Sequence, residues 1–177
     1  KNHPNRKRFV AFHPMWGTEN SGPKAAQKES FAGRAAVICD REDSEQDALA
    51  LVENIAKNLE MHLIYMNADA HDVHTAYISH ISHITSYALA NTVLEKEREE
   101  DTIFQLASSG FSSTVRLAKS HPEMWVPIFK QNKENVLDVL NEHITQLRKF
   151  KSALEKENFE LLEELIKNAN KIRGILK

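Results

Sequence analysis

Residues 35–66 have the sequence AAVICDREDSEQDALALVENIAKNLEMHLIYM, and this stretch decides the fold of the first part of the chain. Its two ends, 35–39 and 62–66, are short apolar runs of the kind that form buried strands. Between them, residues 44–59 place apolar side chains three or four positions apart, which predicts an amphipathic helix. Strand, helix and strand in this order form the repeating unit of a doubly wound α/β sheet.

A third apolar run, residues 9–12, precedes this unit and ends at His13 and Pro14. The following loop, 17–24, is rich in Gly, Pro, Ser and Asn. Three strands are too few for a complete doubly wound sheet, so we expect residues 1–67 to be the C-terminal portion of a larger α/β domain. Neither G-x-G-x-x-G nor the phosphate loop that ends in Gly-Lys-Ser/Thr occurs in the 177 residues.

Residues 68–177 predict an all-helical domain, which makes the fold class mainly α with an α/β remnant before it. Its first helix is expected over 69–98. A capping box formed by Ser120 and Glu123 predicts the start of a long helix over 122–155. The apolar stripe of the first helix is predicted to consist of Tyr77, Ile81, Ile84 and Ala88.

The helix over 122–155 and the last helix carry apolar stripes at spacings of three, four and seven residues. Two such helices at the end of a short chain have little of their own protein to cover them. We therefore predict a homodimer through the C-terminal helices. A helical hairpin that packs on the first helix within one chain is the alternative, and both arrangements can hold together.

Composition excludes several classes of protein. The net charge is -2, 41% of residues are hydrophobic and 27% are charged, as in a globular chain. A pI near 6.5 gives no reason to expect nucleic acid or an anionic membrane as partner. No apolar run approaches the roughly 20 residues of a membrane span, and no signal peptide is visible. With a single cysteine and hence no internal disulfide framework, we expect a cytoplasmic protein.

Four histidines fall on the first predicted helix: His71, His74, His80 and His83. The last two are three residues apart and share a face. This face either lines a helix interface or forms the wall of a pocket for a polar anion. A metal site that uses His71, Asp72 and His74 is the third possibility. We expect no metal, because nine residues separate His71 from His80, about 180° on a straight helix.

Other polar residues also allow two interpretations. His13 ends a strand, and ligands bind outside the carboxyl ends of strands in open α/β sheets, but a loop histidine held by backbone groups is equally compatible. Glu19 lies in the same loop and is either functional or merely solvated. Arg116, among apolar neighbours, needs an anionic partner from the protein or from a substrate. Trp125 is expected in the core.

Three stretches together resemble the prephenate dehydrogenase family. The first is 13–22, HPMWGTENSG, similar to H-P-M-x-G-x-E-x-S-G. The second is His71-Asp72 with 79–83, SHISH, similar to H-D followed by S-H-x-P-H. The third combines Gly110-Phe111, Thr114-Val-Arg116, Met124-Trp125 and 132–135, NKEN. The resemblance extends from about Phe9 to the C-terminus.

The resemblance implies a fold and a reaction. The family has an N-terminal Rossmann domain that binds NAD(P)+ and a helical domain that binds substrate and dimerises. It oxidises prephenate by hydride transfer to NAD(P)+, with decarboxylation to 4-hydroxyphenylpyruvate, in tyrosine biosynthesis. The chain then corresponds to the C-terminal part of such an enzyme, without most of the Rossmann domain, and we expect no turnover from it alone. The alternatives are an arogenate dehydrogenase and a non-catalytic dimerisation module.

The resemblance also implies roles for individual residues. His13 corresponds to the catalytic base that accepts the C4 hydroxyl proton, a task suited to a neutral histidine near pH 7. Arg116 corresponds to an arginine that binds a substrate carboxylate. The remaining substrate-binding residues are expected to be His80, His83, Glu19, Ser109, Gly110 and Trp125, and the cofactor-binding residues His13, Thr18 and Ser79.

Three positions depart from the family pattern. Trp16 replaces a smaller residue, which predicts a differently shaped loop beside the nicotinamide. Ser82 replaces a proline between the two histidines, which predicts a straighter helix there. Ser113 stands where some members have an acidic residue, which leaves an ion pair at the pocket entrance in doubt.

Overall fold

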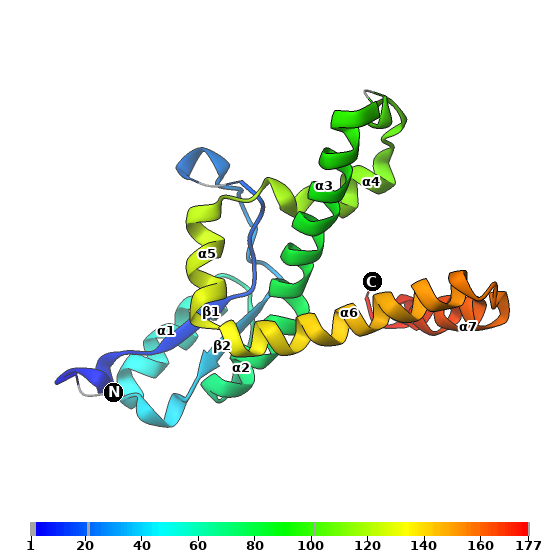
Figure 1. The fold of residues 1–177 in the computed structure, drawn as a ribbon. Helices are drawn as coiled ribbons and strands as arrows, with labels where there is room; N and C mark the ends of the chain where they lie inside the picture. The colour runs from blue at the N-terminus through cyan, green and yellow to red at the C-terminus, as the bar shows by residue number, and fades with distance from the viewer. Residues whose placement is uncertain (1–2, 21, 101, 177) are drawn as a thin grey trace.

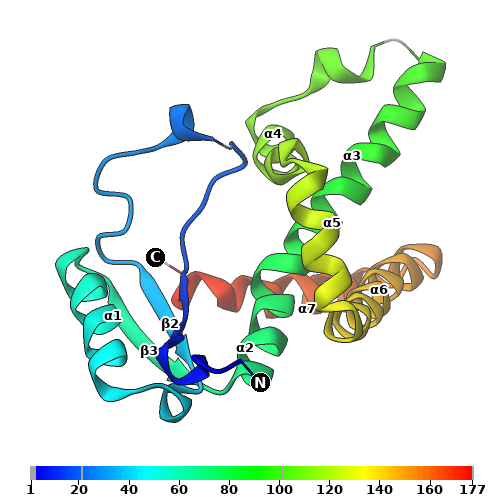
Figure 2. The ribbon, with the colours of Figure 1, turned by 90° about the vertical axis from the view of Figure 1, so that its left-hand side faces the viewer.

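The computed structural model describes residues 3–20, 22–100 and 102–176, with nothing assigned to the side chains of residues 99 and 100. Ser21, part of the first family motif, lies outside them. A small sheet with one covering helix forms the first part of the chain, and helices form the rest (Figures 1 and 2). The first part ends with β3 at Met66, and helix α2 begins at Ala68.

The sheet contains β1 (Ala11–Pro14), β2 (Ala35–Cys39) and β3 (His62–Met66), in the order β1-β2-β3. Strands β2 and β3 are parallel and are connected by α1 (Gln46–Asn58), which confirms the predicted strand-helix-strand unit. Strand β1 is antiparallel to β2, with His13 opposite Val37. The first strand therefore runs against the direction that a doubly wound sheet would give it.

The core beneath the sheet is small. Ala36 and Ala56 are fully buried and pack with Met61, and Phe12, Phe31 and Leu63 add partly buried surface. Ile38, in β2, is also fully buried. Such a limited apolar core makes polar contacts with the helices important for the position of β1.

The predicted helix over 69–98 is interrupted. It consists of α2 (Ala68–Thr75), a π-helical segment (Ala76–His80) and α3 (Ile81–Glu100). Asn67 caps α2, because its Oδ1 accepts a hydrogen bond of 2.7 Å from the amide of Ala70. The predicted apolar stripe is wrong at Tyr77, which is 46% exposed, and at Ala88, which is also exposed; the buried positions are instead Thr75, Ala76, His80, His83 and Ser86.

The predicted helix over 122–155 is also broken. It consists of α5 (Pro122–Gln131) and α6 (Lys133–Glu155), which run in very different directions on either side of Asn132 (Figure 1). The capping box is wrong as well. His121 is the N-cap of α5, and the buried Ser120 hydroxyl has no hydrogen-bond partner among the described residues.

The helical part is completed by α4 (Ser109–Thr114) and α7 (Phe159–Ala169). Helix α7 folds back along α6 and forms a hairpin that extends away from the sheet (Figure 1). Large apolar side chains on this hairpin remain exposed, including Leu147, Leu154, Phe159, Ile166 and Ile172. The 3₁₀ turns are Arg6–Arg8, Pro23–Ala25, Arg41–Asp43, Ile103–Leu106, Arg116–Lys119 and Asn170–Gly174.

Among the described residues, every helix is too short or too polar to cross a lipid bilayer.

Candidate active site

A cavity of about 640 Å³ lies where the loop after β1 meets the helical part of the chain. Strand β1 and its loop contribute one wall, the π-helical segment and the start of α3 a second, and α5 a third. The residues that the sequence predicted for a site and that line this cavity are His13, Thr18, Ser79, His80, His83 and Trp125.

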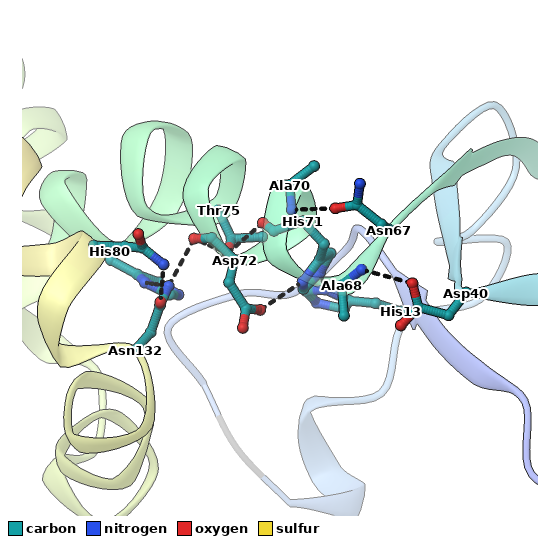
Figure 3. Close-up of polar contacts among 11 residues, drawn as sticks. His13, Asp40, Asn67, Ala68, Ala70, His71, Asp72, Thr75, His80 and Asn132 are labelled. Carbon is teal, nitrogen blue, oxygen red and sulfur yellow. Dashed lines mark hydrogen bonds and ion pairs between the residues drawn. The ribbon is translucent and has the colours of Figure 1, made fainter. Parts of the chain in front are cut away.

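His13 lines the cavity, but not for the reason predicted from its place at the end of a strand. Because β1 is antiparallel to β2, the rule for the carboxyl ends of parallel strands does not apply to it. Instead, its imidazole Nδ1 lies 2.8 Å from Nε2 of His71, near the start of α2 (Figure 3). Burial, and then the neighbouring His71, lower the pKa of His13 below 6.5. The imidazole is therefore neutral near pH 7 and can act as a base.

Two further histidines lie on the same side. His80 Nδ1 lies 3.3 Å from the side-chain amide nitrogen of Asn132, which is the donor. His83 Nδ1 lies 3.0 Å from the carbonyl oxygen of Ser79 and donates to it. Burial lowers the pKa of both imidazoles. Each is thus a neutral group with a fixed tautomer, in which Nε2 is the donor of His80 and the acceptor of His83.

Trp125 is both a buried residue and part of the cavity wall. Its side chain is only 7% exposed, as expected for a core residue, yet it lines the cavity. Its ring stacks on that of His83 with a centroid separation of 3.4 Å and an interplanar angle of 27°. An aromatic wall of this kind suits the flat ring of a small substrate.

Glu19 and Arg116 form an ion pair beside the cavity, with Nη1 of Arg116 at 2.7 Å from Oε2 of Glu19. Neither residue lines the cavity, but their neighbours Asn20 and Leu117 do. A hydrogen bond with its own backbone, and then Arg116, lower the pKa of Glu19. The Arg116 side chain is 49% exposed, so it is less buried than its apolar neighbours indicated. This pair forms although Ser113 is not acidic.

The two remaining predicted substrate-binding residues are not part of the cavity wall. Ser109 and Gly110, at the start of α4, do not line the cavity. Their expected role in substrate binding stays a prediction.

Several residues that shape the site had no role predicted from their sequence pattern. The side-chain nitrogen of Asn132 donates a hydrogen bond of 2.7 Å to the carbonyl oxygen of Asp72 and also contacts His80 (Figure 3). Asn135 donates to Oδ1 of Asn132, which fixes the orientation of that amide. The only sequence signal was that both asparagines belong to the third family motif.

The predicted separation of about 180° between His71 and His80 assumed a straight α-helix. It was wrong, because the π-helical segment between them is wound less tightly than an α-helix. Both residues consequently approach the same network around Asn132 and Asp72. Within the described residues, no three His, Cys, Asp or Glu side chains gather closely enough to hold a metal ion.

Comparison with known proteins agrees with this arrangement. Residues 67–168 match the family model described as the prephenate dehydrogenase dimerization domain, and residues 1–65 match the one described as its nucleotide-binding domain. The fold and the site thus define the class of protein. It combines part of a nucleotide-binding sheet with a helical domain, and a histidine-lined cavity lies between them. The chain belongs to the prephenate dehydrogenase family.

Individual relatives give the same result. The chain is 31% identical to a prephenate dehydrogenase of Bacillus subtilis, over 96% of its own length and 46% of the relative's. It is 30% identical to a cyclohexadienyl dehydrogenase of Zymomonas mobilis, over 96% of its own length and 58% of the relative's. The chain therefore spans about half the length of the curated relatives it matches.

A solved structure, prephenate dehydrogenase from A. aeolicus in complex with hydroxyphenyl propionate and NAD+, superposes on the chain with a TM-score of 0.87. The sequence identity is 30%, and the match covers 97% of this chain and 60% of that one.

Three histidines with lowered pKa values predict a pH dependence of stability. The pKa values of His13, His80 and His83 are lowered from 6.5 in the folded chain. Below about pH 6.5 the unfolded chain therefore binds more protons than the folded one, and the free energy of unfolding falls as pH decreases. Urea denaturation at about pH 7.5 and about pH 5.5 should give a lower value at the acidic pH, with a smaller difference for His83→Gln. Equal values at both pH values would contradict the lowered pKa values of these three histidines.

Proposed function

We propose that the chain forms the substrate-binding and dimerising part of a prephenate dehydrogenase, with the domain boundary near residues 67 and 68. The observation that carries the proposal is the neutral imidazole of His13 in a cavity that two buried histidines and a tryptophan also line. A cavity of about 640 Å³ is large enough for a substrate with one six-membered ring.

The reaction requires a proton acceptor at the ring carbon that carries the hydroxyl group. Nε2 of His13 accepts the proton of the C4 hydroxyl while C4 loses its hydrogen with both electrons. The C4 oxygen becomes a carbonyl oxygen, the bond from C1 to the ring carboxylate breaks, and its electron pair makes the ring aromatic. Carbon dioxide leaves, and the imidazolium of His13 returns its proton to the phenolate oxygen, so no net proton is consumed.

Charged and polar groups beside His13 orient this substrate. Arg116 has five N–H donors, and one of them binds Glu19, so a substrate carboxylate can bind the others or displace Glu19. His80 offers Nε2–H as a donor to the substrate's polar groups, and Nε2 of His83 accepts. Trp125 covers the ring and excludes water.

NAD(P)+ fits one side of the cavity. A nicotinamide carboxamide needs a hydrogen-bond donor and an acceptor, and hydroxyl groups such as those of Thr18 and Ser79 provide both. The bound cofactor supplies the hydride acceptor. We propose that turnover also requires a glycine-rich phosphate loop, which the 177 residues do not contain.

Arogenate, which has an amino group where prephenate has a keto group, is the alternative substrate. Comparison of kcat/KM for the two compounds decides between them.

The enzyme is proposed to act in the cytoplasm, in keeping with the family's role in amino-acid biosynthesis.

We also propose that the chain is a homodimer through α6 and α7. The apolar side chains on this hairpin are poorly covered: Leu147 is 55% and Leu154 56% exposed. Burial of such side chains stabilises association by roughly 25 cal/mol per Å² of apolar surface removed from water. The match of residues 67–168 to a dimerization domain supports a dimer formed by the helical part of the chain.

Loss of the base should affect the chemical step. In a longer chain with the complete nucleotide-binding domain, His13→Asn should lower kcat by roughly 10²-fold or more, the scale of general-base catalysis. The measurement is NAD(P)+-dependent formation of 4-hydroxyphenylpyruvate. His74→Asn, an exposed histidine of α2, is the matched control and should leave kcat unchanged. An undiminished kcat for His13→Asn would exclude His13 as the base.

Charge on the hairpin should dissociate the dimer. Sedimentation equilibrium should give about twice the chain mass of 20.2 kDa for the unchanged protein. The double variant Leu147→Glu and Leu154→Glu should be monomeric, because burying two carboxylates costs more than the apolar contacts gain. Leu51→Glu, on α1 and 61% exposed, is the control and should remain a dimer. A monomeric unchanged chain would refute the proposed interface.

A further inference from the structure

Three side chains form a continuous polar chain that ends at the proposed base. Nδ1 of His13 lies 2.8 Å from Nε2 of His71, and Nδ1 of His71 lies 3.0 Å from Oδ1 of Asp72 (Figure 3). His13 belongs to β1, whereas His71 and Asp72 lie in the middle of α2. The two imidazoles are thus brought together from positions 58 residues apart.

The carboxylate of Asp72 decides where each proton lies. An ionised carboxylate only accepts hydrogen bonds, so Nδ1 of His71 must carry a hydrogen. A neutral imidazole has one N–H, which leaves Nε2 of His71 with a lone pair. The contact of 2.8 Å therefore requires the hydrogen to be on Nδ1 of His13. Nε2 of His13 is then the unprotonated nitrogen, and it is the one free to meet a ligand.

The opposite arrangement needs a positive charge on His71. A His71 cation would donate from Nε2 to Nδ1 of His13, and a neutral His13 would then carry its hydrogen on Nε2 and could not act as a base. The first arrangement needs no charge on either ring, so it is the one that two neutral imidazoles adopt beside an ionised carboxylate.

The backbone that carries His71 and Asp72 is held firmly. The Thr75 hydroxyl contacts the carbonyl oxygens of both residues, at 2.9 and 3.1 Å. Asn132 donates a hydrogen bond of 2.7 Å to the Asp72 carbonyl oxygen from the junction of α5 and α6. These bonds fix the direction from which His71 approaches His13.

We propose that His71 and Asp72 are positioning residues, which hold His13 in the tautomer with hydrogen on Nδ1 and so present the Nε2 lone pair to the substrate hydroxyl. This assignment rests on the proposed function, since it gives the base the lone pair that proton abstraction from C4–OH requires. When His13 accepts that proton, its Nδ1–H continues to donate to His71, and Asp72 stabilises the new positive charge through His71.

The tautomer can be measured on the 177-residue chain without any turnover. Long-range ¹H–¹⁵N NMR spectra of protein with ¹⁵N-labelled histidine rings distinguish a protonated ring nitrogen from an unprotonated one, and His13→Asn identifies the His13 signals. At neutral pH we expect a protonated Nδ1 and an unprotonated Nε2 for His13. A His13 that carries its hydrogen on Nε2 would overturn the proposal.

Variants separate this role from simple packing. His71→Phe removes the acceptor, so signals of the Nε2–H form of His13 should appear, and Asp72→Ala should have a similar effect. His71→Gln places an amide oxygen near the position of Nε2 and should retain the Nδ1–H form. His74→Phe, at an exposed position of the same helix, should not alter His13. An unchanged His13 ring in His71→Phe, or equal behaviour of His71→Gln and His71→Phe, would contradict the proposal.

Kinetics of a longer chain with the complete nucleotide-binding domain provide the second test. His71→Phe should lower kcat by about 10-fold or more, as expected when a supporting hydrogen bond is lost, with little change in KM for prephenate. His71→Gln should restore most of kcat. An unchanged kcat for His71→Phe would overturn the catalytic part of the proposal. If the unchanged longer chain does not oxidise prephenate, the proposed function fails, while the NMR result still decides the tautomer.

Discussion

The contact between His13 and His71 connects the sheet to the helices, and the geometry of the cavity depends on it. Strand β1 lies at the edge of the sheet and is bonded on one side only, to β2. Its other anchor in this region is the imidazole pair at 2.8 Å. A hydrogen bond depends on the distance and angle between its donor and acceptor, so this contact limits how far β1 can move from α2. The loop after β1 is thereby held against the π-helical segment.

Local periodicity predicted much of the fold. The parallel strands β2 and β3 and the helix between them follow from short apolar runs and an amphipathic repeat, which are properties of contiguous residues. The direction of β1 did not follow, because four residues carry no signal for their partner strand. The breaks at Ala76–His80 and at Asn132 did not follow either. There, hydrogen bonds between distant residues, such as Asn132 with Asp72, override the local helical preference.

Part of the site was also predicted, but from family motifs and not from periodicity. Family motifs identified His13, His80, His83 and Trp125, which the fold brings to one cavity. Physical reasoning from the residues alone left the roles of the three histidines open and predicted only a core position for Trp125. The buried face of the helix is rich in histidine and serine rather than apolar residues, so a search for an apolar stripe was directed to the wrong side. The partner of Arg116 was also open, and Glu19 is its partner in the absence of substrate.

We propose that the cavity beside Arg116 binds a ring compound that carries a carboxylate, and that His13 contacts this compound. Titration calorimetry of hydroxyphenyl propionate into the 177-residue chain tests this directly. We predict one ligand bound per chain. Arg116→Ala should bind at least about 10-fold more weakly, since a hydrogen bond between charged groups contributes about 1.5–3 kcal/mol. Arg116→Lys should lie between the two, because it keeps the charge but not the planar fork. Absence of binding, or equal affinity of the unchanged chain and Arg116→Ala, would contradict the account.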